Sequence, residues 1–156
     1  MSIDDVDRQG DTIAVDGWRL DSYLRNPVFL WAHNYARPAI GRAVAVWKEA
    51  HRLMARVEFA PTDFAQEVRR LYEAGYQQGV SVGFRPMRYA LRRDLRSGEF
   101  QGVDFLEQEL LEISAAPVPA TAQALKKALA DKPIMSAFFS HSDLARYAAA
   151  VPPDVS

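Results

Sequence analysis

Apolar and polar positions alternate in the middle of the chain, and the alternation predicts a hairpin. The odd positions from Leu53 to Phe59 are apolar, and two of the three even positions are charged. A period of two is typical of a strand with one buried face. The apolar run 43–47 precedes this segment, and a polar connection over 48–52 joins the two. We therefore expect two paired strands over 43–59.

Four further segments have the pattern of strands. A short β-prone run over 11–17 ends in an Asp-Gly turn signal. Asn26-Pro27 sets an extended start for the apolar run 28–33, which is too short for a helix and fits a buried strand. Two longer β-like stretches follow at 80–91 and at about 105–118. The charged loop 92–98 separates them.

Apolar residues at helical spacing predict a helix that starts at Asp63. Phe64, Val68, Leu71 and Tyr72 form one stripe, and Asp63 with Gln66 fits a capping box. Glycines at 75 and 79 mark its end. Two further helices are expected, over 122–130 behind a Thr121 cap and over 142–150. Strands clustered mid-chain with few helices indicate an α+β domain with an antiparallel sheet or barrel.

Composition narrows the function classes. The 156 residues suit one domain, and a net charge of -1 removes the electrostatic case for a nucleic-acid binder. The chain has no cysteine, and its three histidines stand far apart, so we expect no disulfide, metal site or cofactor. No apolar run is long enough to span a membrane, and the acidic start is not a secretory signal. Any chemistry must then use oxygen nucleophiles and histidine.

Two residues are candidates for a serine–histidine pair. His33 ends an apolar strand where the chain turns polar, so its ring could face a cleft as a general base; the alternative is a structural strand-end histidine. Ser81 lies between valines and shares one strand face with Gly83 and Arg85. It could be the nucleophile, or a core serine bonded to backbone with Gly83 at a bulge.

An acidic partner is sought on the last long strand. The candidates are Asp104, Glu107, Glu109 and Glu112. Glu112 stands out because it lies within Leu-Leu-Glu-Ile-Ser, where a buried carboxylate is costly unless an imidazolium or arginine pairs with it. The alternative is an edge-strand carboxylate paired with lysine or arginine. Ser114 shares the face of Glu112 and is a rival nucleophile.

Three blocks of the chain carry a family resemblance as a set. They are Asp-Arg-Gln-Gly-Asp at 7–11 with 26–34 and 40–42, Gly-Val-Ser-Val-Gly-Phe-Arg at 79–85, and Leu-Leu-Glu-Ile-Ser at 110–114 with Pro-Val-Pro-Ala at 117–120. In this order they resemble the prohead (capsid maturation) serine proteases of HK97-type tailed phages, relatives of the herpesvirus assemblin proteases. The family's histidine and serine fall on His33 and Ser81, and we assign the acidic third member to Glu112.

The resemblance implies a fold, an activity and partners. The fold is an assemblin-like, mostly antiparallel β-barrel flanked by helices. The activity is endopeptidase cleavage, with autocleavage, of major capsid protein or scaffold segments inside the immature capsid in the host cytoplasm. A homodimer is expected by analogy with the assemblins. The expected mechanism is acyl transfer by a Ser/His pair, with backbone N–H groups near Gly83, or Arg85, supporting the oxyanion.

We also expect a division of the chain into two parts, and two alternative functions remain open. We expect a protease domain over 1–133 and a C-terminal extension of unknown role over 134–156. Only six residues precede Asp7, where relatives carry a strand-forming segment, so we expect that strand to be short or absent. One rival is a non-catalytic capsid-assembly module. The other is an unrelated serine hydrolase with a Gly-x-Ser-x-Gly elbow at 79–83, disfavoured because His33 precedes the serine and no helix follows it.

Overall fold

Strand β7 (Phe100–Ala115) is the central strand of the sheet. Three short strands pair with one of its edges in parallel, one after another: β1 (Thr12–Ile13), β2 (Trp18–Arg19) and β3 (Val28–Trp31). Strand β6 (Val80–Arg93) pairs antiparallel with β7 along almost its whole length. The structure is a computed structural model, and it describes residues 11–49, 52–118, 126–128 and 134–139.

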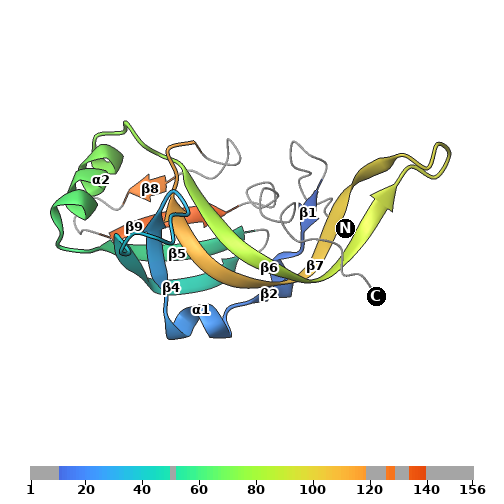
Figure 1. Cartoon of the computed structure of the whole chain (residues 1–156), viewed down its shortest axis with the longest axis horizontal. Coiled ribbons are helices and arrows are strands. Elements are labelled where there is room, and N and C mark those ends of the chain that lie inside the picture. The colour runs from blue at the N-terminus through green and yellow to red at the C-terminus, as the bar shows by residue number, and fades with distance from the viewer. Residues whose placement is uncertain (1–10, 50–51, 119–125, 129–133, 140–156) are drawn as a thin grey trace.

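From β3 the sheet continues through a series of antiparallel strands. These are β4 (Gly41–Glu49), β5 (Arg52–Phe59), β9 (Ile134–Phe139) and β8 (Lys126–Ala128). The expected hairpin over 43–59 is therefore confirmed. Figure 1 shows the strands as a strongly curved sheet.

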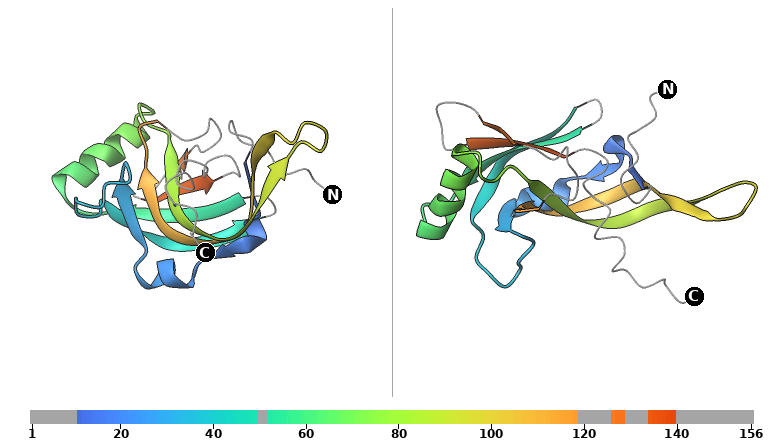
Figure 2. Two further views of the ribbon diagram at one scale, coloured as in Figure 1. Left: turned by 45° about the vertical axis from the view of Figure 1, so that its right-hand side comes forward. Right: turned by 90° about the horizontal axis from the view of Figure 1, so that it is seen from above.

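The sheet is open, so the expected barrel is wrong while the α+β class is confirmed. Among the described strands, β6 lies at one edge and β8 at the other, and no ladder joins them. The far halves of β6 and β7 instead leave the body as an arm (Figure 2), with β1 paired to β7 at its base. A closed barrel needs a ladder between the two edge strands, which the described residues do not form.

Apolar side chains on the β6 strand of the arm are exposed. Met87, Tyr89 and Leu91 are 53%, 57% and 55% exposed. At its tip the side chain of Asp94 accepts hydrogen bonds from the backbone N–H groups of Ser97 and Arg96, both 2.8 Å long. These bonds lower the pKa of Asp94 and close the turn.

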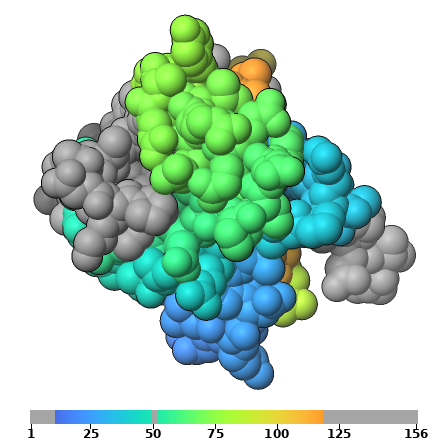
Figure 3. All heavy atoms as spheres, turned by 90° about the vertical axis from the view of Figure 1, so that its left-hand side faces the viewer, coloured from blue at the N-terminus to red at the C-terminus, as the bar shows by residue number. Residues whose placement is uncertain are grey.

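The helix expected near residue 63 is present as α2 (Asp63–Glu73). Its N-cap is Thr62, one residue before the expected cap, and the Thr62 hydroxyl accepts the Ala65 N–H. Gly75, at φ 82°, follows the helix. Val68 and Tyr72 are buried against the sheet, where Phe59 packs between Tyr72 and Phe29 with ring centroids 6.2 and 5.4 Å apart. Figure 3 shows α2 across this end of the molecule.

The remaining elements depart from the expectations. The segment after the first strand forms a 3-10 turn (Val15–Gly17) and a short helix, α1 (Asp21–Arg25), neither of which was predicted. Residues 126–128 form β8, so the helix expected over 122–130 is wrong there. The helix expected over 142–150 lies outside the described residues. Strand β9 extends the sheet just beyond residue 133, and the division of the chain at that point stays a prediction.

Candidate active site

The pairing of β6 with β7 gathers four of the residues under consideration on one face. Ser81 lies opposite Ser114, and Gly83 lies opposite Glu112. Directly opposed side chains share a face, and residues two apart on one strand share it too. Ser81 and Ser114 are 5% and 0% exposed, so this face is packed inside the protein.

His33 reaches the same place from the other side of β7. Strand β3 pairs Leu30 with Ser114, and the chain turns sharply after it. Ala32 and His33 have φ angles of 49° and 57°, left-handed conformations that cost non-glycine residues about 1–3 kcal/mol each. Two hydrogen bonds hold the turn: the Ala32 N–H donates to the Ala115 carbonyl (2.8 Å) and the His33 N–H to Ser114 Oγ (3.1 Å).

A buried carboxylate connects these groups. The His33 ring donates from Nδ1 to Glu112 Oε1 at 2.5 Å, and Ser114 Oγ donates to Glu112 Oε2 at 2.6 Å. Glu112 is 1% exposed, and burial of its charge is tolerable because both oxygens accept hydrogen bonds. With the proton on Nδ1, the neutral ring has Nε2 as its basic nitrogen.

Gly83 makes room for this carboxylate. A Cβ atom at position 83 would lie 2.5 Å from Glu112 Oε1, which is far inside van der Waals contact. The sequence suggested Gly83 as a support for an oxyanion; the structure gives it a steric role beside the acid. That role requires the absence of a side chain and explains a glycine in the middle of a buried strand.

The carboxylate also affects a tyrosine of α1. Tyr23 is 2% exposed, and its hydroxyl donates to the Val28 carbonyl at 3.0 Å. Burial raises the pKa of Tyr23 above its ordinary value, and the negative charge of Glu112 raises it further. No sequence pattern distinguished this tyrosine.

The start of β6 is fixed by α2. The Tyr72 hydroxyl donates to the Gly79 carbonyl, which also accepts the Ala116 N–H at 3.0 Å. Gly79 lies two residues before Ser81, so these bonds fix the register that sets Ser81 opposite Ser114. The hydroxyl of a helix residue thereby helps to position the candidate nucleophile.

Arg85 is the predicted site residue that the structure keeps outside this group. Its side chain is 65% exposed and pairs with Glu109 at 2.5 Å. Together with a hydrogen bond from Ser22, Arg85 lowers the pKa of Glu109. The oxyanion role of Arg85 stays a prediction.

The other acidic candidates have arginine partners. Asp104 accepts the Thr12 hydroxyl at 2.6 Å and lies 3.4 Å from Arg92. Glu107 pairs with Arg19 at 2.7 Å. Glu112 differs from these acids in that its partner is the His33 ring.

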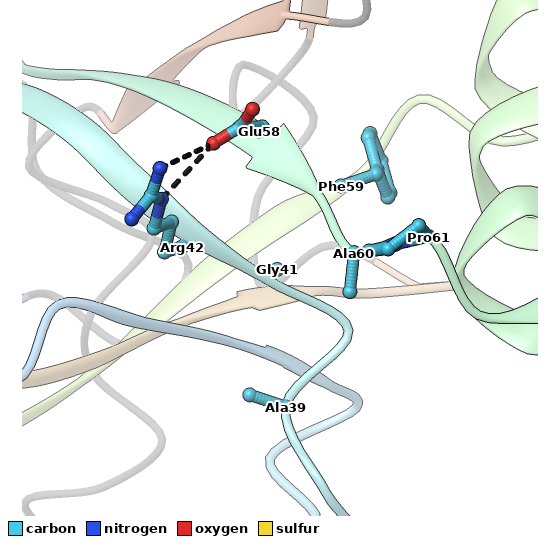
Figure 4. Close-up of a pocket in the computed structure, with 7 residues that line it drawn as sticks. All are labelled: Ala39, Gly41, Arg42, Glu58, Phe59, Ala60 and Pro61. Atoms are coloured by element: carbon cyan, nitrogen blue, oxygen red, sulfur yellow. Dashed lines mark hydrogen bonds and ion pairs between the residues drawn. The ribbon is translucent and has the colours of Figure 1, made fainter.

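The described residues contain no metal-binding cluster, and a pocket among them lies away from the predicted site residues. No group of three or more His, Asp or Glu side chains could hold a metal ion there. A shallow pocket of about 410 Å³ lies beside the exposed Arg42–Glu58 ion pair (3.0 Å) and contains none of the predicted site residues (Figure 4). Within the described residues, no helix is long and apolar enough to cross a membrane.

Comparison with known proteins identifies the family. The family model for caudovirus prohead serine proteases matches residues 20–137, about three quarters of the chain. The chain belongs to this family, and the matched region includes β3, the hairpin of β6 and β7, and all five predicted site residues. No curated protein and no solved structure matches the chain significantly.

Family membership confirms the expected class of protein, a phage prohead serine protease. A phage prohead serine protease is a hydrolase of capsid maturation, and the family implies contact with capsid or scaffold proteins. The relation to the assemblins stays a prediction. Nothing in the match or the structure supports the expected homodimer.

Proposed function

We propose that this protein is an endopeptidase that cleaves scaffold and capsid-protein segments through an acyl-enzyme. Ser81 is the nucleophile, His33 the general base and Glu112 the acid that orients the base. The observation that carries the proposal is the hydrogen bond from His33 Nδ1 to the buried Glu112 (2.5 Å) on the strand that pairs with Ser81. A nucleophile, a base and a third group that orients the base form the recurring arrangement of serine hydrolases.

The mechanism follows from the roles. His33 Nε2 takes the proton of the Ser81 hydroxyl as the oxygen attacks the peptide carbonyl, and the imidazolium then protonates the leaving amine. Water next attacks the acyl-enzyme, again losing a proton to His33, and Ser81 is regenerated with release of the new carboxyl end. Glu112 stabilises the imidazolium in both halves of the cycle.

The contacts of Ser114 argue for Ser81 as the nucleophile. The Ser114 hydroxyl donates its only proton to Glu112 and accepts the His33 N–H. A hydroxyl already engaged with the carboxylate is poorly placed to give that proton to the imidazole. Ser81 is therefore the better candidate.

An oxyanion needs N–H donors near Ser81. Arg85 is held by Glu109 at 2.5 Å, so backbone N–H groups of β6 around Gly83 are the better candidates. The cycle would operate inside the immature capsid of the host cell, where capsid protein or scaffold segments and other copies of the protease are the substrates.

Co-expression with the major capsid protein of the same phage tests the proposal. Intact-mass spectrometry should find shortened capsid or scaffold protein with the wild type and full-length protein with Ser81→Ala. A fluorophosphonate probe should label the wild type on Ser81 and leave Ser81→Ala unlabelled, since loss of a nucleophile costs on the order of 10⁶-fold in kcat. Absence of both product and label in the wild type would favour a non-catalytic assembly module.

A further inference from the structure

We infer that Ser114 is a positioning residue that fixes both the backbone of His33 and the carboxylate of Glu112. The inference rests on the proposed function and adds a fourth member to its site. Its basis is one fully buried hydroxyl with two hydrogen bonds, accepted from the His33 N–H at 3.1 Å and donated to Glu112 Oε2 at 2.6 Å.

The first contact fixes the turn from which the imidazole projects. Ala32 and His33 both lie in the left-handed region, at φ 49° and 57°, so this turn is unfavourable unless other bonds hold it. The Ala32 N–H is bonded to the Ala115 carbonyl and the His33 N–H to Ser114 Oγ. Because the second acceptor is a side chain, the exact direction of the His33 Cα–Cβ bond depends on residue 114.

The second contact fixes the carboxylate. Glu112 Oε1 accepts from the His33 ring while Oε2 accepts from Ser114, and a Cβ atom at position 83 would lie 2.5 Å from Oε1, so Gly83 leaves the carboxylate its space. A carboxylate held on two oxygens cannot rotate away from the ring without breaking the bond to Ser114. The same hydroxyl thus sets both the origin of the imidazole and the acceptor that orients it.

The register of the sheet gives Ser114 this double role. It lies opposite Ser81 on β6 and beside Leu30 on β3, so a strand pairs with β7 on each edge at this position. A serine hydroxyl offers one donor and two acceptor sites, so it can serve both neighbours at once. An alanine would preserve the packing and serve neither.

The test separates positioning from nucleophilic attack by two readouts. In the wild-type background, Ser114→Ala should label with a fluorophosphonate on Ser81 about 10- to 100-fold more slowly, the range expected for loss of a hydrogen bond to a charged group. Ser114→Thr, which keeps the hydroxyl, should recover most of the rate. Ile113→Val, a buried neighbour on the opposite face, controls for a general loss of packing.

The second readout does not need activity. In a Ser81→Ala background, proton NMR should detect the His33 Nδ1–H as a downfield resonance, and adding Ser114→Ala should broaden or remove it while circular dichroism stays native. If Ser114→Ala fails to fold, Ser114→Cys, whose thiol is a weak donor, takes its place. An unchanged resonance and labelling rate would overturn the inference while leaving Ser81 as nucleophile; labelling of Ser114 itself would overturn both this inference and the proposed function.

Discussion

His33 Nδ1 and Glu112 Oε1 lie 2.5 Å apart although 79 positions separate the two residues in the chain. Their approach depends on β3 pairing in parallel with β7, which brings the turn after Trp31 to the end of the strand that carries Glu112. The ring is partly open to solvent, with 23% of its side chain exposed, whereas the carboxylate side chain is 1% exposed. The pair therefore combines a buried carboxylate with an imidazole that is partly open to solvent.

Removing the charge of Glu112 should greatly reduce activity. Glu112→Gln keeps the size of the side chain but turns its amide group toward the ring or toward Ser114, so the preferred imidazole tautomer and the stabilisation of the imidazolium are lost. Loss of the acid in other serine proteases lowers kcat by about 10⁴-fold. Fluorophosphonate labelling rates and cleavage of the co-expressed capsid protein measure the effect.

Glu109→Gln is the matched control for that variant. Glu109 lies on the same strand three residues away but pairs with the exposed Arg85 at 2.5 Å. Because the Arg85 side chain is 65% exposed, solvent screens this pair, which contributes about 0–1 kcal/mol, and labelling should stay within a few-fold of the wild type. Equal losses in the two variants would count against Glu112 as the acid of the site.

Gly83→Ala should displace the Glu112 carboxylate without removing its charge. The new methyl group would lie 2.5 Å from Glu112 Oε1, and the carboxylate is held by two hydrogen bonds, so one of these must break or β6 must shift. We expect a loss of about 1–3 kcal/mol in the free energy of unfolding, typical of overpacking, together with slower labelling. Urea titration and the labelling assay measure the two effects.

A shortened acid supplies the control for Gly83→Ala. Glu112→Asp withdraws the carboxylate from position 83, so the double variant should be more stable than the sum of the two single losses implies. Strict additivity in this double-mutant cycle would mean that the glycine is required for some other reason.

The sequence predicted the strands and the helix whose residues have a clear hydrophobic periodicity. The alternation over 53–59 and the apolar stripe from Phe64 to Tyr72 correspond to β5 and α2. The short helix α1 and strand β2 escaped prediction because five and two residues contain too little periodicity to be recognised. The segment at 126–128 forms a strand through its pairing with β9, a partner that local propensity does not reveal.

For the candidate site, too, the sequence predicted some features and missed others. A charged residue inside the apolar run 110–114 marked Glu112 as a buried acid in need of a partner, and the structure supplies His33. The left-handed turn at Ala32 and His33 and the two contacts of Ser114 depend on parallel pairing between distant strands, which no local spacing encodes. Sequence could therefore indicate candidate reactive groups better than the bonds that orient them.

Asp11 should matter for stability. Its buried carboxylate accepts the Val103 N–H at 2.7 Å, tying the start of β1 to β7. Asp11→Ala leaves that N–H without this acceptor and should cost about 2 kcal/mol, or about 4–8 °C in Tm for a domain of this size. Differential scanning calorimetry measures the shift, and labelling per folded molecule should not change.

Asp16→Ala is the control for this variant, because Asp16 is an exposed residue of the neighbouring 3-10 turn. Its Tm should move by less than about 2 °C, as for most surface substitutions. A loss of labelling in Asp11→Ala at full folding would instead give this acidic residue a role in the reaction.

Stability should fall at alkaline pH, in part through Tyr23. Burial and the charge of Glu112 raise the pKa of Tyr23 in the folded protein, whereas a tyrosine in the unfolded chain ionises near pH 10. The unfolded state therefore binds fewer protons above about pH 10, and the free energy of unfolding should decrease by up to about 1.4 kcal/mol per pH unit for this group. Urea unfolding between pH 8 and 11 measures the slope.

Tyr23→Phe should flatten that slope while lowering stability at neutral pH by about 1 kcal/mol, because the hydrogen bond to the Val28 carbonyl is lost. Burial also raises the pKa of Tyr72, so part of the slope should remain in this variant. Tyr76→Phe, at a position 86% exposed, controls for removal of a phenol from the surface. A slope that is identical in wild type and Tyr23→Phe would mean that neither burial nor the charge of Glu112 raises the pKa of Tyr23 in the folded protein.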